Sequence, residues 1–409
     1  RLAGDPLKGN SMADVAKVTD TLNNGTSVNI QTDNLTGPND NSITITDAIR
    51  KTSGGDVTLR LKATGAININ ADITAETPAS AATPTGKLSL EVTSDTNKTA
   101  GGSVSVASGT SINTLGGSVK IGGGLVYNGV GFANSQSSGE AGITLNGVTI
   151  DTRVDPAGAP GTAGGSVEMA GSTTADAAGV LLAGSTIRTG TGKVTLIGKS
   201  TGSNTALAKG ISIDGGSSIT TRTVELRTDS INLAGQITGD NDPAGYAKVW
   251  TLSDGRAINF GTGTGGLDLA GNTFSGSGKI TNFYKNIVGD AGQKANITVG
   301  GVTSDSDLEL NTGAGTMAVS GTVNVASGHA LTLASKGQVA GTGKITTDAL
   351  RLDAADAEVS LTGANAVKNV DGKAKKLTLK NSGNLAVGAE TGLVTGAGGA
   401  DIDVAGDLT

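Results

Sequence analysis

Apolar and polar residues alternate in short runs along this chain of 409 residues. In the stretch 101–124, GGSVSVASGTSINTLGGSVKIGGG, Val104 and Val106 are spaced two residues apart, as are Val119 and Ile121. Gly/Ser-rich sequence by itself is typical of a flexible linker. Alternation at a period of two residues is instead typical of a β-strand with one buried face. The stretch is therefore predicted to be ordered β-structure.

Similar alternating runs recur from end to end. They read VTLRL (57–61), KLSLEV (87–92), SVKI (118–121), KVTLI (193–197), VELRT (224–228), LDLAG (267–271), LELNT (308–312), ALTLAS (330–335), ALRLDA (349–354) and KLTLK (376–380). Paired leucines at 308/310, 331/333, 350/352 and 377/379 are about 19 to 27 residues apart, which is within the range of solenoid repeats. No segment of ten residues has the pattern of a helix.

Short strands at about three per coil, without helices between them, predict an all-β fold, a parallel β-helix (β-solenoid) with about 22 residues per coil. Each coil lies on the one before, and ladders of Val, Ile, Leu and Ala fill a narrow interior. Glycines at the corners supply positive φ and allow neighbouring turns to approach closely. The stretch 101–124 is then one coil or slightly more.

One elongated domain is expected, with three segments. Regular coils occupy 1–239 and 301–409, and an aromatic-enriched segment of the same solenoid occupies 240–300. A loop is expected at 155–165, where the sequence is DPAGAPGTAGG.

An antiparallel β-sandwich is the competing fold. Its hairpins are commonly closed by Asn-Gly or Asp-Gly pairs. Such pairs occur at Asn24-Gly25, Asn128-Gly129, Asn146-Gly147, Asp214-Gly215, Asp254-Gly255 and Asp371-Gly372. Because they are sparse and irregularly spaced, they favour the β-helix over the sandwich.

Composition narrows the function classes. Glycine accounts for 66 residues, aromatic residues for only 2%, and the formal net charge is −6. An acidic chain is a poor partner for nucleic acid or anionic lipid, which both attract clustered Lys and Arg. The 36% of hydrophobic residues disfavours disorder. No apolar run approaches the roughly 20 residues that span a bilayer, and the absence of cysteine excludes disulfide and thiolate chemistry.

The aromatic residues are unevenly distributed. Six of the eight lie between positions 246 and 284, namely Tyr246, Trp250, Phe260, Phe274, Phe283 and Tyr284. One interpretation is a wider coil or capping loop that needs large interior side chains, and Phe260 and Phe274 belong to it. The other is a surface platform, because Trp and Tyr combine an apolar face with a polar tip suited to sugar rings or a protein partner. The predicted ligand-binding residues are Tyr246, Trp250 and Tyr284, with Lys248, Asp254 and Arg256 as polar partners.

Catalysis has to be considered, because β-helices also host polysaccharide lyases and hydrolases, which need converging carboxylates. The candidates are Asp305 with Asp307, Asp353 with Asp356 and Glu358, and Asp240 with Asp242. They are interpreted as solvated strand ends and turns. The single histidine, His329, is interpreted as an exposed turn residue without a partner. No metalloprotease, serine-hydrolase or phosphate-loop motif occurs, so no catalytic residue, metal or cofactor is expected.

Two surface features are explained without a functional role. Asn-x-Thr sequons at Asn24, Asn34, Asn97 and Asn296 are expected by chance in a sequence rich in Thr and Asn, and glycosylation is the alternative. The basic cluster Lys373, Lys375, Lys376 and Lys380 is interpreted as a solvated edge rather than a site for acidic glycans.

The repeats resemble those of filamentous-haemagglutinin-type exoproteins, the large adhesins of two-partner secretion in Gram-negative bacteria. The resemblance lies in NNGTSVNIQTDN (23–34) and SITITDAIRKTSGGDVTLRLKATGAININADITA (42–75), with looser similarity at 101–124 and 190–235. ITNFYKNIVGD (280–290) is also similar to a segment common in such proteins. The similarity covers most of the chain, as a style of repeat rather than a catalytic signature.

This resemblance implies a right-handed β-helix rod, secreted and displayed at the outer membrane through a secretion partner. It implies adhesion to host cells or cell–cell and biofilm aggregation, with a glycan, an exopolysaccharide or a surface protein as ligand. A polysaccharide-active β-helix enzyme is the alternative function.

Overall fold

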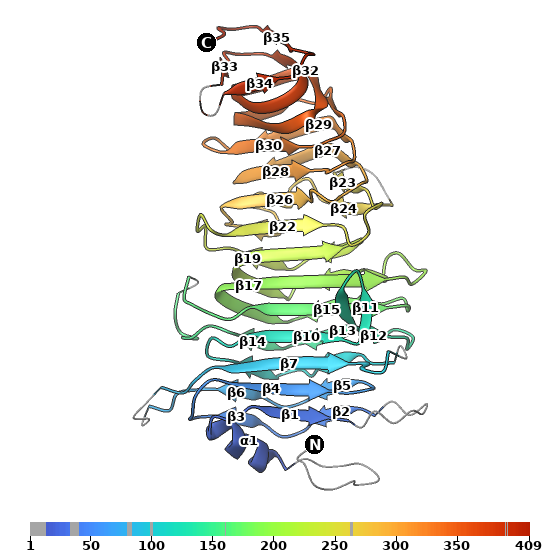
Figure 1. Cartoon of the computed structure of the whole chain (residues 1–409), viewed down its shortest axis with the longest axis vertical. Helices are drawn as coiled ribbons and strands as arrows, with labels where there is room; N and C mark the ends of the chain where they lie inside the picture. The colour runs from blue at the N-terminus through green and yellow to red at the C-terminus, as the bar shows by residue number, and fades with distance from the viewer. Residues whose placement is uncertain are drawn as a thin grey trace. The chain divides into compact units, whose positions relative to one another are not determined.

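The computed structural model describes residues 14–32, 41–79, 84–98, 101–159, 161–261, 265–388, 390 and 392–409. The chain forms two compact units. Unit 1 comprises Arg1–Val224 and Asn232–Ile237, and unit 2 comprises Glu225–Ile231 and Thr238–Thr409. The division between them falls within β19 (Ser218–Thr228), β20 (Ile231–Leu233) and β21 (Gln236–Thr238). Each unit is a parallel β-helix, as predicted (Figure 1).

Unit 1 has three ladders of parallel strands. The first contains β1 (Val28–Gln31), β4 (Val57–Lys62), β7 (Leu88–Ser94), β10 (Val119–Gly123), β15 (Val167–Thr173) and the second half of β17 (Thr186–Ser200). The second contains β2 (Ile43–Ile45), β5 (Ile67–Ile69), β8 (Val104–Val106), β13 (Ile143–Asn146), β16 (Val180–Ala183) and β18 (Ile211–Ile213). The third contains β3 (Ile49–Lys51), β6 (Ile73–Ala75), β9 (Ser111–Asn113), β14 (Thr149–Asp151) and the first half of β17.

The interior of unit 1 consists of stacked aliphatic side chains. In the first ladder Leu59 pairs with Leu90, Leu90 with Val119 and Val119 with Val167, and all four are at most 1% exposed. Aliphatic residues of similar size therefore stack at the same register along the interior of unit 1. The stretch 101–124 supplies β8, β9 and β10, one strand to each ladder, so the prediction that it forms about one coil is confirmed.

A helix covers one end of unit 1. Helix α1 (Val15–Asn23) begins at Asp14, whose side chain accepts a hydrogen bond from the Ala16 N–H at 3.0 Å. Its buried residues Val18 and Leu22 face the first coil, where α1 packs on β3 and β1. The exposed edge of a parallel sheet would otherwise offer unpaired backbone groups to other chains. The sequence pattern excluded helices of ten residues, and α1, with nine residues, is shorter than that limit.

Unit 2 has two long ladders. One contains β22 (Tyr246–Trp250), β26 (Lys285–Gly289), β28 (Asp307–Asn311), β30 (Ala330–Ala334) and β32 (Ile345–Asn381). The other contains β23 (Ile258–Phe260), β27 (Ile297–Ser304), β29 (Met317–Val325), β31 (Val339–Gly341) and β32. The remaining strands are β24 (Leu267–Leu269), β25 (Ile280–Thr281), β33 (Ala386–Val387), β34 (Leu393–Thr395) and β35 (Ala400–Val404).

Coil length differs between the units. In unit 2, Thr312 and Ser335 lie 23 residues apart on successive coils and their hydroxyls are hydrogen-bonded. In unit 1 the register partners Arg60 and Glu91 are 31 residues apart, and Asn134 and Ser172 are 38 apart. The prediction of about 22 residues per coil is therefore wrong for unit 1, and also for the first coil of unit 2, in which Tyr246 pairs with Lys285, because the corners of these coils carry longer loops.

Columns of glycine form some of the corners, as predicted. A Cβ atom on Gly321 would lie 1.7 Å from the Gly300 oxygen, one on Gly343 would lie 2.0 Å from the Gly321 oxygen, and one on Gly363 would lie 2.2 Å from the Gly343 oxygen. Successive turns here approach so closely that any side chain would force the backbones apart.

Candidate ligand-binding surface

The aromatic residues of unit 2 divide between the interior and the surface. Phe260, Phe274 and Phe283 are 0%, 1% and 1% exposed, and the Phe260 and Phe274 rings lie 6.1 Å apart. The interpretation of Phe260 and Phe274 as core residues is confirmed. Tyr246 and Trp250 are only partly buried, and Tyr284 is 43% exposed. The residues with polar tips are therefore the ones that reach solvent.

Strand β22 places three of the predicted residues on one outer face. Its Ala247 and Val249 are fully buried, and Val249 continues the inner ladder through Val288. Because side chains alternate along a strand, Tyr246, Lys248 and Trp250 all point outward. We call these three residues the β22 surface.

Lys248 is fixed at the centre of the β22 surface. Its Nζ lies 2.5 Å from Asp290 Oδ2 and 4.6 Å from the centroid of the Trp250 ring. Burial opposes ionisation of Asp290, but hydrogen bonds from Lys248 and Gly292 and the charges of Lys248 and Arg227 together lower its pKa below the ordinary value. The ammonium is therefore held beside the indole by both a carboxylate and the ring itself.

Tyr246 is held at the other end of the strand. Its hydroxyl donates a hydrogen bond to Glu225 Oε1 at 2.6 Å. Burial, then this hydrogen bond, then the charge of Glu225 raise the pKa of Tyr246 to about 12. The phenol is thus a fixed donor at neutral pH.

The sequence prediction missed a second cation near this surface. Arg227, on β19, is close enough to Asp290 to lower the pKa of that carboxyl group. The Arg227 Nε is buried and has no hydrogen-bond partner among the described residues. Its position beside β22 follows from strand pairing across a coil, which its sequence position does not reveal.

The remaining predicted residues are not part of β22, although Tyr284 directly precedes Lys285, the register partner of Tyr246. Tyr284 precedes β26, and Asp254 and Arg256 follow β22 in a turn. Asp254 forms an exposed ion pair with Lys294 at 3.2 Å. Arg256 donates hydrogen bonds to the carbonyl oxygens of Asp229 and Gly266, both at 3.3 Å. Each polar side chain in the turn therefore has a local structural partner.

His329 is not isolated, contrary to the sequence-based interpretation. Its Nδ1 lies 3.1 Å from Asp307 Oδ1, which also accepts a hydrogen bond from the Ala330 N–H. Arg351 lies 3.8 Å from the other Asp307 oxygen and 2.9 Å from Glu390. His329 and Asp307 are 22 residues apart, which is one coil of unit 2. Applying the coil spacing to polar residues would have found this pair.

The other carboxylates are separate. Asp305 accepts a hydrogen bond from the Gly276 N–H, whereas Asp307 faces His329, so the two do not share a partner. Asp240 and Asp242 accept bonds from nearby backbone N–H groups within their own turn. Asp353, Asp356 and Glu358 are exposed on β32. Across the part of the chain that the structure describes, no group of three His, Asp or Glu side chains could hold a metal ion.

The basic cluster and the sequons lie largely at the surface. Lys373, Lys375, Lys376 and Lys380 are all exposed, in agreement with a solvated edge. Asn24 and Asn296 are exposed and Asn97 is partly buried, whereas Asn34 lies outside the described residues.

Two aromatic residues that the sequence analysis did not single out lie in unit 1. Tyr127 is on β11 (Leu125–Tyr127) and Phe132 is on β12 (Val130–Ser135), and these strands form an antiparallel hairpin. The Asn128-Gly129 pair between them was the available signal, since this pair is typical of tight hairpin turns.

Comparison of the chain with protein families, with curated proteins and with solved structures finds no significant match. Within the described ranges, no helix has the length and apolar character needed to cross a membrane.

Proposed function

We propose that this chain is the β-helical repeat region of a secreted adhesin at a Gram-negative bacterial surface, similar to the filamentous-haemagglutinin exoproteins. Its role would be attachment to host cells or cell–cell and biofilm aggregation. The family assignment is supported by the resemblance of the repeats and by the parallel β-helix that they form. Export through an outer-membrane partner is part of the same proposal.

The β22 surface carries the binding part of the proposal. Trp250 is the only tryptophan in the chain, and it occupies an outward position although the interior of the same segment takes up three phenylalanines. An indole partly exposed beside an oriented ammonium offers an apolar face for a sugar ring and a charge for an acidic substituent. The nearby Arg227 adds a second positive charge. We therefore propose acidic glycans or exopolysaccharide as the ligand class.

The test uses a glycan array followed by calorimetric titration of the best glycan, because Trp250→Ala removes the only tryptophan and with it the fluorescence signal. Trp250→Ala should weaken binding by about 2 kcal/mol, roughly 30-fold, as expected of a central interface aromatic. Its thermal unfolding should be unchanged, because the side chain is not part of the inner ladder.

Two control variants separate binding from folding. Phe260→Ala should lower the stability of unit 2 by about 3–5 kcal/mol, because Phe260 is fully buried. Val394→Ser changes a residue that is 58% exposed and should affect neither property. Equal loss of stability in Trp250→Ala and Phe260→Ala would make Trp250 a core residue and remove the proposed platform.

The enzyme alternative has a specific location to test. Asp307, His329 and Arg351 form the ionisable cluster in which a lyase or hydrolase would find an acid and a base. A product assay on acidic polysaccharides, with wild type and His329→Ala, decides between the classes. Turnover that disappears in the variant would replace adhesion by catalysis.

A further inference from the structure

The hairpin of β11 and β12 leaves the coil of unit 1. Asn128 and Gly129 at its tip have φ values of 49° and 78°, as a two-residue type I′ turn requires. A Cβ atom on Gly131 would lie 2.3 Å from the Gly123 oxygen, so glycine allows the start of β12 to approach the end of β10. The turn and these glycines direct the hairpin away from the path of the coil.

Outward positions close to the hairpin are apolar and covered. Ala170 and Ile197 pair across β15 and β17, and they alternate with inward-facing residues of the ladder. They are nevertheless only 2% and 7% exposed. Phe132 is 1% exposed and meets the Tyr127 ring edge-on at a centroid distance of 6.4 Å. The hairpin therefore packs on the outer face of the coils.

A polar ladder runs beside this apolar patch. Asn134 on β12 pairs with Ser172 on β15, and Ser172 pairs with Lys199 on β17. The Ser172 hydroxyl donates to Asn134 Oδ1 at 2.8 Å, and the two residues are only 5% and 3% exposed. The Asn134 amide N–H groups have no protein acceptor in the described part of the chain. They remain available to a ligand.

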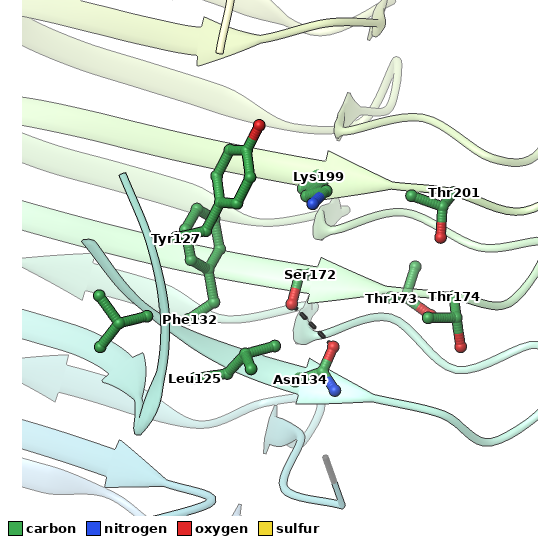
Figure 2. Close-up of a pocket in the computed structure, with 10 residues that line it drawn as sticks. Leu125, Tyr127, Phe132, Asn134, Ser172, Thr173, Thr174, Lys199 and Thr201 are labelled. Carbon is green, nitrogen blue, oxygen red and sulfur yellow. Dashed lines mark hydrogen bonds between the residues drawn. The ribbon is translucent and has the colours of Figure 1, made fainter. Parts of the chain in front are cut away.

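A cavity of about 180 Å³ lies between the hairpin and the polar ladder. Figure 2 shows Leu125, Tyr127 and Phe132 on one side and Thr174 and Thr201 on the other, with Asn134, Ser172 and Lys199 between them. Pockets for drug-sized molecules span roughly 300–1,000 Å³. This cavity is therefore suited to one small ring rather than to an oligomer.

Lys199 gives the cavity a positive charge without a counter-ion. Its Nζ lies 3.9 Å from the centroid of the Tyr127 ring, which holds the ammonium at the wall of the cavity. No carboxylate within the described ranges forms an ion pair with it. An anionic ligand would supply the missing partner.

We propose that this cavity binds a single acidic sugar residue of the hexuronate type. The carboxylate matches Lys199, the ring hydroxyls match the Asn134 amide and the Thr174 and Thr201 hydroxyls, and the apolar ring face matches Leu125 and Tyr127. All these groups belong to unit 1, so this site is independent of the β22 surface and of the function proposed for it.

The test compares galacturonate with galactose, which differ only in the carboxylate or hydroxymethyl group at C6. Titration calorimetry on the full chain should give at least about tenfold tighter binding of galacturonate, since a charge-assisted hydrogen bond is involved. Lys199→Gln should remove this preference, with little effect on galactose. Tyr127→Ala should weaken both sugars, and Tyr127→Leu should weaken galacturonate alone while it keeps an apolar wall.

Lys209→Gln is the matched control, because it removes the same charge from unit 1 at a position outside the cavity. Oligogalacturonate is tested in parallel: its binding indicates a chain-end site, and binding of galacturonate alone indicates a site for the free sugar. Three results would each overturn the proposal. They are equal affinity for galactose and galacturonate, an unchanged preference for galacturonate in Lys199→Gln, and displacement of galacturonate by sulfate at equal concentration. Absence of binding of any sugar would overturn it as well.

Discussion

Side-chain chemistry rather than size decides which aromatic residues of unit 2 enter the core. The three buried phenylalanines have no polar atom to satisfy, whereas the Tyr246 hydroxyl requires an acceptor and finds it in Glu225. The sequence indicated the aromatic cluster and assigned Phe260 and Phe274 to the interior. It could not indicate Arg227 or Glu225, because these residues reach β22 only through the stacking of coils.

The first prediction concerns the ionisation of Tyr246. Near-ultraviolet titration of the three tyrosines should contain one step near pH 12, and Tyr246→Phe should remove it. Because the folded-state pKa lies above the unfolded value of about 10, this group stabilises the fold below pH 10. That contribution is lost as the pH rises through 12.

Glu225→Gln provides the companion variant for this titration. It keeps a hydrogen-bond acceptor but removes the negative charge, so the pKa of Tyr246 should fall while the step remains. A titration of Tyr246→Phe that still contains the high-pH step would assign it to another tyrosine.

At the scale of elements, a buried ion pair holds the first residues of the loop predicted at 155–165. Arg153 and Asp151 pair at 2.6 Å with side-chain exposures of only 10% and 8%. The Arg153 guanidinium also donates to the carbonyl oxygens of Pro156 and Gly158. The loop position was evident from its proline and glycine content. The Arg153–Asp151 ion pair was not evident from the sequence, because it depends on Asp151 pointing away from the inner ladder.

The second prediction follows from the Arg153–Asp151 ion pair. Arg153→Ala should destabilise unit 1 by about 3–5 kcal/mol, since it leaves the buried Asp151 carboxylate without a counter-ion and with only the backbone N–H of residue 153 as donor. Denaturant titration measures the loss. Arg60→Ala breaks the Arg60–Glu91 pair, whose side chains are 40% and 43% exposed, and should cost less than about 1 kcal/mol. An equal loss of unfolding free energy in the two variants would contradict a structural role for the buried Arg153–Asp151 ion pair.

At the scale of the whole chain, strand identity was predictable and coil length was not. The Leu-x-Leu runs became inner ladders because alternation depends only on which face of a strand is buried. Leu308, Leu331 and Leu350 do stack in register. Their spacing, however, describes only the coils of unit 2 from β26 onward. Loops at the corners lengthen the coil from β22 to β26 and the coils of unit 1 without changing the alternation.

The third prediction concerns cooperativity. Leu331→Asp would place a carboxylate in the inner ladder between Leu308 and Leu350, where the wild-type residue is 0% exposed. Hydrogen exchange should show loss of protection in β28, β30 and the first part of β32, with protection retained in unit 1. Leu331→Met should retain protection in both units, because its volume is similar. Loss of protection throughout the chain in Leu331→Asp would indicate one cooperative unit.

The β11–β12 hairpin has a consequence for engineering. The hairpin lies between Ile121 and Asn134, yet these two residues pair with Met169 and Ser172, which lie close together on the single strand β15. Extra residues are therefore accommodated as an excursion that returns the chain to the same ladder. Foreign peptides can therefore be inserted between Asn128 and Gly129. Such a peptide would be displayed at the hairpin tip while the coils themselves keep their register.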